Sequence, residues 1–363
     1  MHRFYDDALL ITCISDTHCK HSPLRFPSIP QHPSSSNASP SDSSSSSCGL
    51  SGDILIHTGD FTALGTPIEI SSFIDWLHEQ PFTLKILIAG TCLTLTHVPH
   101  LTCLWLLYII IILILPPYII APTLIYTPLG NHDMTLHEDY YLNHGHALFH
   151  RHTKKPPYDT KECREMLHRY SDIIYLEDSY INLRVLSPTP SSSSSDTVTV
   201  TASVASKPSV IKVYGSPWQP EFFGWAFNAQ RGPEILGKWR MIPSDVDILL
   251  THGPPYGYGD TAGGERVGCM DLMNELTHRI RPRLHVFGHI HEDAGVWTHN
   301  YDPSTITDTP QRSSTKLINA CTCDLNYRPT HPPISLKYPL SASTLPSRLD
   351  LSSYYVTKDG DST

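Results

Sequence analysis

Several features that would mark common protein classes are missing from this sequence. The segment Met1 to Asp7 lacks the charged-then-apolar pattern of a secretory signal, and its acidic pair argues against a mitochondrial presequence. The nine cysteines are scattered, with only Cys321 and Cys323 close together, and no spacing indicates a disulfide framework or a zinc ribbon. A reducing, cytoplasmic location is therefore expected. The formal net charge is −9, so nucleic acid is not expected as the main partner, although a local basic groove stays open.

Charge is also missing from one long internal stretch, because no Asp, Glu, Lys or Arg occurs from Ile86 to His132. Within it, residues 101–115 are almost wholly apolar. A helix of that length rises roughly 22 Å, which is short of the ~30 Å hydrocarbon core of a bilayer. Pro116 and Pro117 end it, and no basic residue flanks it. We therefore do not expect a membrane span, although membrane association stays open as the minority alternative.

The same stretch interrupts a sequence pattern. Removing residues 91–130 joins the apolar run that ends at Gly90 directly to Asn131-His132-Asp133. Pyrimidine-rich noncoding sequence translates into apolar runs, and Gly90-Thr91 and Leu129-Gly130 can be encoded with splice-donor and splice-acceptor dinucleotides. We therefore hypothesise that residues 91–129 are retained intron sequence. Sequencing the mature transcripts tests this, and a majority containing the segment would refute it.

Other segments have compositions that do not favour packing. Residues 28–50 are rich in Ser, residues 187–208 are rich in Ser and Thr, and residues 332–363 form a similar C-terminal tail. Without these and residues 91–129, roughly 250 residues remain, which is the size of one α/β domain. The sequence predicts a single domain over residues 8–331 with three insertions and a tail.

Five short polar clusters each follow an apolar run typical of a buried strand. The predicted strands cover residues 8–14, 53–57, 84–89, 246–250 and 284–287. Side chains at the ends of strands can meet at one edge of a sheet although they are far apart in sequence. The clusters are Asp16-Thr17-His18, Gly59-Asp60, Gly130-Asn131-His132-Asp133, Thr251-His252-Gly253 and Gly288-His289-Ile290-His291.

These residue types suit two neighbouring divalent cations. A carboxylate such as Asp60 can bridge two metals about 3.5–4 Å apart, and Asn131 offers a neutral oxygen. Imidazoles mixed with carboxylates favour Mn, Fe, Zn or Co over Mg. His132 is left free to protonate a leaving group, and Asp133 could hold its tautomer. Each cluster alone has an ordinary explanation, such as a turn or a helix N-cap, but five in this order predict a site that activates a hydroxide for attack on phosphorus.

This order of motifs resembles the calcineurin-like metallophosphoesterase superfamily. It is most similar to the small metallophosphoesterase-domain proteins related to class III cyclic-nucleotide phosphodiesterases. The resemblance covers nearly all of the chain outside the suspected insertions. The phrases that carry it include ISDTH at 14–18, DILIHTGDFT at 53–62, GNHD at 130–133, LLTHGPPYGYGD at 249–260, RPRLHVFGHIHE at 281–292 and NACTCDLNYRPTHPP at 319–333.

The resemblance implies a fold and a ligand set. The fold would be a four-layer α/β/β/α sandwich of two mixed sheets with outer helices, and His132 would be the catalytic histidine. The break between Gly90 and Asn131 is the departure from the family pattern. One metal would be held by Asp16, His18, Asp60 and His291, and the other by Asp60, Asn131, His252 and His289.

The sequence says less about the substrate than about the metal ligands. The protein phosphatase branch carries an Arg shortly after its Gly-Asp, but here Asp60 is followed by Phe61-Thr62-Ala63-Leu64-Gly65. Trp218, in an aromatic stretch, could stack a base or simply pack, and Arg266 could meet a phosphate or lie on the surface. We expect a phosphodiesterase for small substrates such as cyclic nucleotides. A nuclease fits the acidic surface poorly. The alternative is an inactive or membrane-associated scaffold, because the insertion splits the motif. No oligomeric state is predicted.

Overall fold

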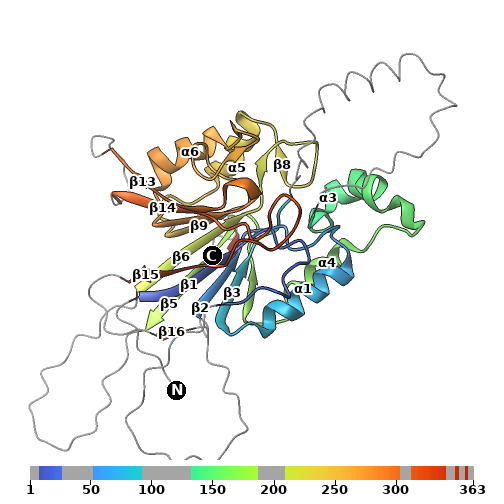
Figure 1. The fold of residues 1–363 in the computed structure, drawn as a ribbon, viewed down its shortest axis with the longest axis horizontal. Coiled ribbons are helices and arrows are strands. Elements are labelled where there is room, and N and C mark those ends of the chain that lie inside the picture. Colours follow the sequence, from blue (N-terminus) through green and yellow to red (C-terminus); the bar gives the residue numbers. More distant parts are fainter. Residues whose placement is uncertain are drawn as a thin grey trace, which may run out of the picture.

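The computed structural model describes residues 8–26, 52–91, 132–186, 209–302, 312–340, 348–350 and 356–358. The predicted insertions at 28–50 and 187–208 lie outside these ranges, as do Asn131 and the apolar segment 101–115. The described residues form two large sheets that face each other, with helices on the outer side of each (Figure 1). The expected four-layer α/β/β/α sandwich is confirmed.

The first sheet has five strands in the order β15-β1-β2-β3-β4 within the described ranges. Strands β1 to β4 run parallel, and β15 lies antiparallel to β1 at the edge. Because the strands β1 to β3 are parallel, the loops that follow them leave the same edge of the sheet. Their bounds are β1 Ala8–Ile14, β2 Gly52–His57, β3 Phe82–Leu87, β4 Ile173–Tyr175 and β15 Ile334–Pro339.

The second sheet follows the order β13-β14-β12-β9-β6-β5-β16, and β17 also pairs with β5. Its four central strands, β14, β12, β9 and β6, run parallel to one another. The bounds are β5 Ser179–Leu186, β6 Ser209–Ser216, β9 Ile248–Thr251, β12 Leu284–Phe287, β13 Gly295–Asn300, β14 Ser314–Asn319, β16 Arg348–Asp350 and β17 Val356–Lys358. Two short pairs stand apart from it, β7 Gln219–Pro220 with β8 Asn228–Ala229 and β10 Thr261–Ala262 with β11 Glu265–Arg266.

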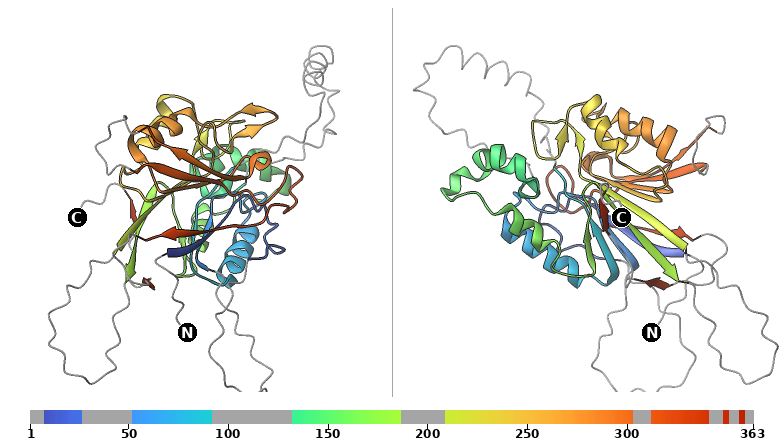
Figure 2. Two further views of the ribbon diagram at one scale, coloured as in Figure 1. Left: turned by 60° about the vertical axis from the view of Figure 1, so that its left-hand side comes forward. Right: turned by 180° about the vertical axis from the view of Figure 1, so that it is seen from behind.

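Helices cover the two outer faces, as the two turned views also show (Figure 2). α1 and α4 lie outside the first sheet, and α5 and α6 lie outside the second (Figure 1). The helices are α1 Pro67–Glu79, α3 Glu138–Tyr140, α4 Thr160–Met166, α5 Pro233–Arg240 and α6 Met270–Glu275. The short 3₁₀ segments are η1 Met134–Leu136, η3 Arg151–Thr153 and η5 His291–Asp293, and the π-helical segments are η2 Tyr141–His150 and η4 Leu276–Ile280.

The alternation of side chains along the strands builds three apolar layers. Ile54 and Ile56 of β2 point into the core between the two sheets, where Leu250 of β9 meets them. Leu55, between them, faces the layer of α1, and Leu249 faces the layer of α5 and α6. A strand buried on both faces has no polar alternation, which explains why these runs look continuously apolar in the sequence.

All five strands predicted ahead of the polar clusters are present, with small shifts at their ends. The domain boundary expected at residue 331 is wrong, however, because β15 belongs to the first sheet and Tyr338 lies buried in the core between the sheets. The composition of this segment alone suggested a tail. Its role as a strand depends on hydrogen bonds to β1, which lies near the other end of the chain. Among the helices in the described ranges, none is both long and apolar enough to cross a bilayer.

His285 in β12 gives the fold a predictable sensitivity to acid. Thr251 donates its hydroxyl to the Gly253 carbonyl (2.8 Å) and so accepts the Nε2–H of His285 (2.8 Å). The buried Nδ1 has no hydrogen-bond partner in the described part of the chain, and burial lowers the pKa of His285 to about 3. The folded protein therefore resists a second proton on this ring.

We expect stability to fall as the pH drops from about 6.5, where the unfolded chain begins to take up this proton, towards pH 3. At pH 5 the contribution of His285 is a loss of ~2 kcal/mol. Urea unfolding between pH 7 and pH 5 measures it. A His285→Gln variant keeps a donor for Thr251 but does not titrate, so its stability should depend less on pH. Equal slopes for the two proteins would contradict this account.

Candidate metal centre

The first two clusters lie in the turns that follow β1 and β2. Asp16 N–H donates to the Gly59 carbonyl (3.0 Å) and His18 N–H donates to the Asp60 carbonyl (2.9 Å), so the two turns hold each other. Asp16, His18 and Asp60 have positive φ angles of 53°, 42° and 59°. Such conformations are costly for residues with a Cβ and concentrate at functional sites. These strained backbone conformations position three side chains that were predicted as metal ligands.

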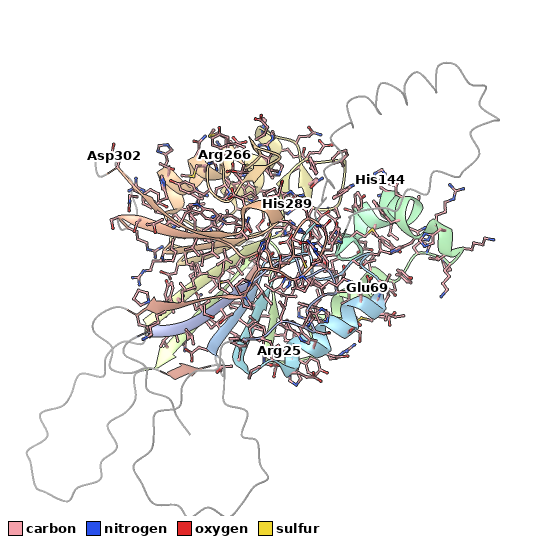
Figure 3. The ribbon with its side chains drawn as sticks, viewed as in Figure 1. Arg25, Glu69, His144, Arg266, His289 and Asp302 are labelled. Atoms are coloured by element: carbon pink, nitrogen blue, oxygen red, sulfur yellow. The ribbon has the colours of Figure 1, made fainter. Side chains whose placement is uncertain are left out.

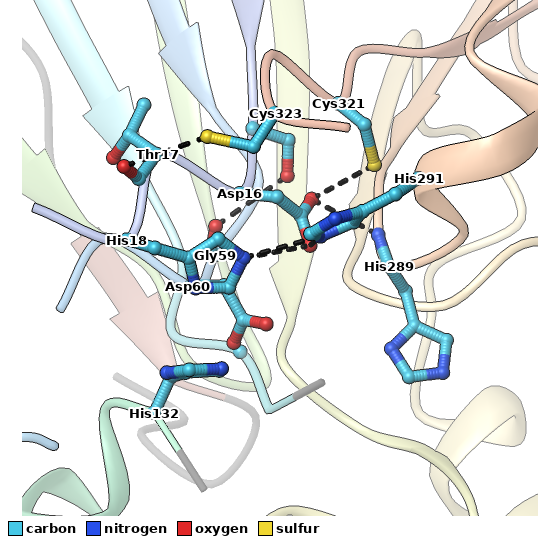
Figure 4. Close-up of polar contacts among 12 residues, drawn as sticks. Asp16, Thr17, His18, Gly59, Asp60, His132, His289, His291, Cys321 and Cys323 are labelled. Carbon is cyan, nitrogen blue, oxygen red and sulfur yellow. Dashed lines mark hydrogen bonds and ion pairs between the residues drawn. The ribbon is translucent and has the colours of Figure 1, made fainter. Parts of the chain in front are cut away.

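Asp16 lies beside His18, from the same turn, and His291, from a distant part of the chain. Its Oδ1 is 3.3 Å from Nε2 of His291 and 3.9 Å from Nε2 of His18, and the two Nε2 atoms are 3.1 Å apart. All three side chains are buried. A Cβ at Gly288 would lie 2.1 Å from Asp16 Oδ2, so glycine is needed for the end of β12 to come this close. Figure 4 shows His18 and His291 pointing to the same space.

Asp60 lies next to this group and is completely buried. Neither of its carboxylate oxygens has a hydrogen-bond partner among the described residues, and Nε2 of His252 is 3.5 Å from Oδ2. His252 was predicted to meet Asp60, and it does. A buried carboxylate without hydrogen-bond donors is costly unless a cation compensates it.

The backbone sets the orientation of two of the imidazoles. The Nδ1 atom of His291 is 3.0 Å from the carbonyl of Asp324, and Nδ1 of His132 is 2.7 Å from the carbonyl of Ala63. Each Nδ1–H therefore donates outward, which leaves Nε2 with its lone pair toward the centre. This is the arrangement in which protein histidines bind metals.

His132 lies against the first group of ligands. Its ring centroid is 4.1 Å from that of His18, and its buried Nε2 has no hydrogen-bond partner in the ranges that the structure describes. Tyr327 covers the rings, with its centroid 4.7 Å from His18 and 6.0 Å from His132. The sequence analysis missed Tyr327. Only its position in the phrase NACTCDLNYRPTHPP could have indicated it.

Asp133 does not hold the tautomer of His132, because the Ala63 carbonyl does so. Its carboxylate instead accepts the backbone N–H groups of Asp60 (2.9 Å), Thr62 (3.0 Å) and Gly90 (3.1 Å). Burial and the nearby Asp60 carboxylate raise the pKa of Asp133 to about 7. Asp133 therefore ties together the turn after β2 and the end of the β3 segment, which carry residues of the candidate metal centre.

Replacing Asp133 by Ala is expected to lower the free energy of unfolding by about 3 kcal/mol or more, because several buried N–H donors lose their acceptor. Urea unfolding measures the loss. The exposed Asp139→Ala variant is the matched control and should change stability by less than about 0.5 kcal/mol. A comparable, small effect of both substitutions would show that Asp133 does not support the turn.

Thr91 occupies a position at the centre that the sequence analysis did not foresee. It follows Gly90, where the uninterrupted motif would place Asn131, and its carbonyl is 3.1 Å from Nε2 of His252. Nδ1 of His252 is 2.9 Å from the Thr58 carbonyl, so both ring nitrogens face carbonyl oxygens. Burial alone would lower the pKa of His252, but the carboxylate of Asp60 raises it to about 9.

His289 lies in the same turn after β12 as His291. Its backbone N–H donates to Asp16 Oδ2 (3.0 Å), its φ is 71°, and its ring centroid is 5.2 Å from that of His252. The ring centroid of Phe222 is 6.4 Å from that of His289. His289 therefore lies near both His252 and Phe222.

Trp218 and Arg266, the predicted substrate residues, already have partners. The indole N–H of Trp218 donates to Asp178 (2.8 Å), and the ammonium of Lys238 lies 3.5 Å from the ring centroid. Arg266 pairs with the buried Asp260 (2.5 Å). Figure 3 shows Arg266 toward the outside of the molecule, whereas His289 lies closer to its middle. These contacts are those of packing residues, and a role in substrate binding stays a prediction.

The donor chemistry fits divalent cations. Three overlapping groups have ligand atoms within 4.8 Å of one another: Asp16, His291 and Cys321; His18, Asp60 and His132; and Asp16, Asp60 and His252. Burial lowers the pKa of His18 well below its ordinary value and that of His289 to about 3, so these rings are neutral and able to bind metal. Asn131 lies outside the described residues, so its predicted role stays untested.

Comparison with known proteins gives concordant results. The family model described as calcineurin-like phosphoesterase matches residues 9–293. The chain is 31% identical over 332 residues to metallophosphoesterase domain-containing protein 1 of Homo sapiens, covering 90% of this chain and 70% of that protein, and the Mus musculus protein of the same name gives the same values. It is 30% identical over 301 residues to UPF0046 protein T07D4.2 of Caenorhabditis elegans, covering 81% of this chain and 56% of that protein.

Proposed function

Since this chain belongs to the calcineurin-like phosphoesterase family, a group of metal-dependent phosphoester hydrolases, we propose that it is a phosphodiesterase for small substrates, with cyclic nucleotides as the best candidates. The observation that carries the proposal is Asp60, a fully buried carboxylate without hydrogen-bond donors among the described residues, between the imidazoles of His18, His132 and His252. A bound divalent cation would offset the cost of burying this carboxylate, which the imidazole of His252 also approaches to 3.5 Å.

The ligands divide into two overlapping sets. Asp16, His18, Asp60 and His291 would hold one divalent cation, and Asp60, His252, His289 and Asn131 would hold the other. When bound, two such cations lower the pKa of a shared water and neutralise the phosphoryl oxygens. Manganese, iron, zinc and cobalt all suit these donors. The relation to class III cyclic-nucleotide phosphodiesterases is part of this proposal.

His132 is suited to assist the departing oxygen. A protonated ring would give its Nε2 proton to the leaving group and return to the neutral form with the proton on Nδ1, which the Ala63 carbonyl already accepts. The surrounding rings of His18 and Tyr327 keep the imidazole in place and limit the access of water. Proton donation therefore requires no reorientation of the side chain.

The loop that carries Phe222, Phe223 and Trp225 offers aromatic rings to a planar substrate group. Phe222 lies beside His289, Phe223 is 60% exposed, and their ring centroids are 4.5 Å apart. Trp225 follows at 6.1 Å from Phe223. Exposed aromatic rings beside a phosphate-binding centre offer a surface on which a nucleobase can stack. The loop after Asp60 supplies no Arg, which favours small diesters over phosphoproteins.

Steady-state hydrolysis tests the proposal. We expect the protein with Mn²⁺ to hydrolyse bis-p-nitrophenyl phosphate at least tenfold faster than the monoester p-nitrophenyl phosphate, and to open 3′,5′-cyclic AMP or GMP. Chelation with EDTA should abolish all turnover. An absence of metal-dependent hydrolysis would reject the enzymatic function, and a preference for the monoester would reject the diesterase assignment.

A second candidate function is a scaffold without activity, and the contact of Thr91 with His252 favours it. In this form of the chain a carbonyl faces the nitrogen that would bind the second cation. A protein with less than one metal per chain that stays with membranes after alkaline carbonate washing would support the scaffold. The cytoplasmic location expected from the sequence stays a prediction in either case.

A further inference from the structure

Cys321 contacts the metal centre, although it belongs to neither ligand set. It lies two residues after the end of β14 and is 2% exposed. Its Sγ donates to Oδ2 of Asp16 at 3.1 Å, the opposite oxygen from the one that faces His18 and His291 (Figure 4). A thiol so close to a predicted ligand needs an explanation.

The backbone, rather than the thiol, fixes this position. Cys321 forms a parallel bridge with Ser15, and the next residue, Thr322, donates its N–H and its hydroxyl to the Ser15 carbonyl, each at 2.9 Å. The N–H of Cys321 donates to the side chain of Asn319 (3.2 Å). The backbone of Cys321 is therefore held beside Asp16 independently of the contact between the thiol and the carboxylate.

The spacing around this sulfur is that of a coordination sphere. The Sγ of Cys321, a carboxylate oxygen of Asp16 and a ring nitrogen of His291 all lie within 4.8 Å of one another. With metal bonds of about 2.0–2.3 Å, neighbouring ligand atoms of a four- or five-coordinate shell lie roughly 3–3.5 Å apart. The sulfur lies 3.1 Å from Oδ2 of Asp16, and Nε2 of His291 lies 3.3 Å from Oδ1 of the same carboxylate. We infer that Cys321 supplies a sulfur ligand to the cation that Asp16 and His291 hold.

This inference rests on the proposed function and changes the chemistry of its centre. On binding, a sulfur–metal bond replaces the S–H bond, and the proton passes to solvent. A thiolate added to the carboxylates of Asp16 and Asp60 brings the ligand charge to −3 against +4 for two cations, which reduces the uncompensated charge in a buried site. A sulfur donor also shifts the preference from manganese toward zinc, iron or cobalt.

Cys323 is the matched control. It is buried like Cys321 and only two residues away, but its Sγ lies 3.9 Å from the Thr17 carbonyl. It belongs to none of the ligand groups found in the described part of the chain. A Cys323→Ser substitution therefore removes a neighbouring thiol without removing the proposed ligand.

Cobalt substitution of the full-length chain tests the inference. We expect Co²⁺-loaded protein to show a thiolate-to-cobalt charge-transfer band in the near ultraviolet, which Cys323→Ser retains and Cys321→Ser loses. Competition titrations should show the Zn²⁺ over Mn²⁺ affinity ratio falling at least tenfold in Cys321→Ser alone. X-ray absorption of the unmutated protein should find one sulfur about 2.3 Å from cobalt, so the result does not depend on a variant that folds.

The outcomes separate the two proposals. Stoichiometric cobalt without a sulfur neighbour would overturn the role of Cys321 and leave the proposed hydrolase intact. Loss of the band in both serine variants would also overturn it, because the effect would then be structural. Protein that binds no cobalt at all would overturn both the sulfur ligand and the metal-dependent function.

Discussion

Joining Gly90 directly to Asn131 is expected to raise the Mn²⁺-dependent kcat/KM for a small phosphodiester by roughly 10²-fold, the scale of one transition-state contact restored. The N–H of Gly90 already lies 3.1 Å from the carboxylate of Asp133, so the two ends of the interrupted motif meet without residues 91–130. The deletion removes the Thr91 carbonyl from Nε2 of His252 and places Asn131 next to Gly90. Both changes complete the second ligand set.

The deletion has an internal control. A protein that lacks residues 91–130 and also carries Asn131→Ala removes Thr91 without restoring the amide ligand. If Asn131 is the missing ligand, this double variant gains much less activity than the simple deletion. An unfolded deletion protein, shown by circular dichroism, or an active full-length chain that loses turnover on deletion, would show that the segment is part of the working structure.

Replacing His132 by Ala in the protein lacking residues 91–130 is expected to lower kcat by roughly 10²-fold or more, with little change in KM, because the ring donates its proton only in the transition state. Steady-state kinetics with two diesters of different leaving-group pKa measure the effect. The poorer leaving group should suffer the larger loss, since it depends more on protonation.

The exposed His144, on the π-helical segment that follows α3, provides the control for this substitution. His144→Ala should leave kcat within about twofold of the parent value. Equal losses for good and poor leaving groups would contradict a proton-donating role for His132 and leave it only a role in holding the oxygens of the phosphoryl group.

The strands and most of the candidate site follow from local patterns. A strand buried on both faces produces an apolar run such as 246–250, and a ligand directly after it lies at the sheet edge. Asp16, Asp60, His252 and His291 were found in this way, and the structure brings them together. The sequence therefore predicts a convergent centre wherever chemistry follows directly on a buried strand.

The remaining features depend on contacts between distant segments. The role of Asp133 requires knowing that three N–H groups from other turns point at it. Tyr327 and Cys321 reach the centre from the segment after β14, which pairs with Ser15 and has no apolar run of its own. The strand β15 is recognised only by its partner β1. No local periodicity encodes such partners.

Metal stoichiometry is the most direct test of the central claim that these side chains converge on a pair of cations. Equilibrium dialysis against Mn²⁺ followed by elemental analysis should find two metals per chain in the protein that lacks residues 91–130. After Asp60→Ala in the same protein we expect fewer than about 0.5 metals per chain, because the ligand proposed to bridge the two cations is lost. No bound metal, or two metals that persist without the Asp60 carboxylate, would contradict the account.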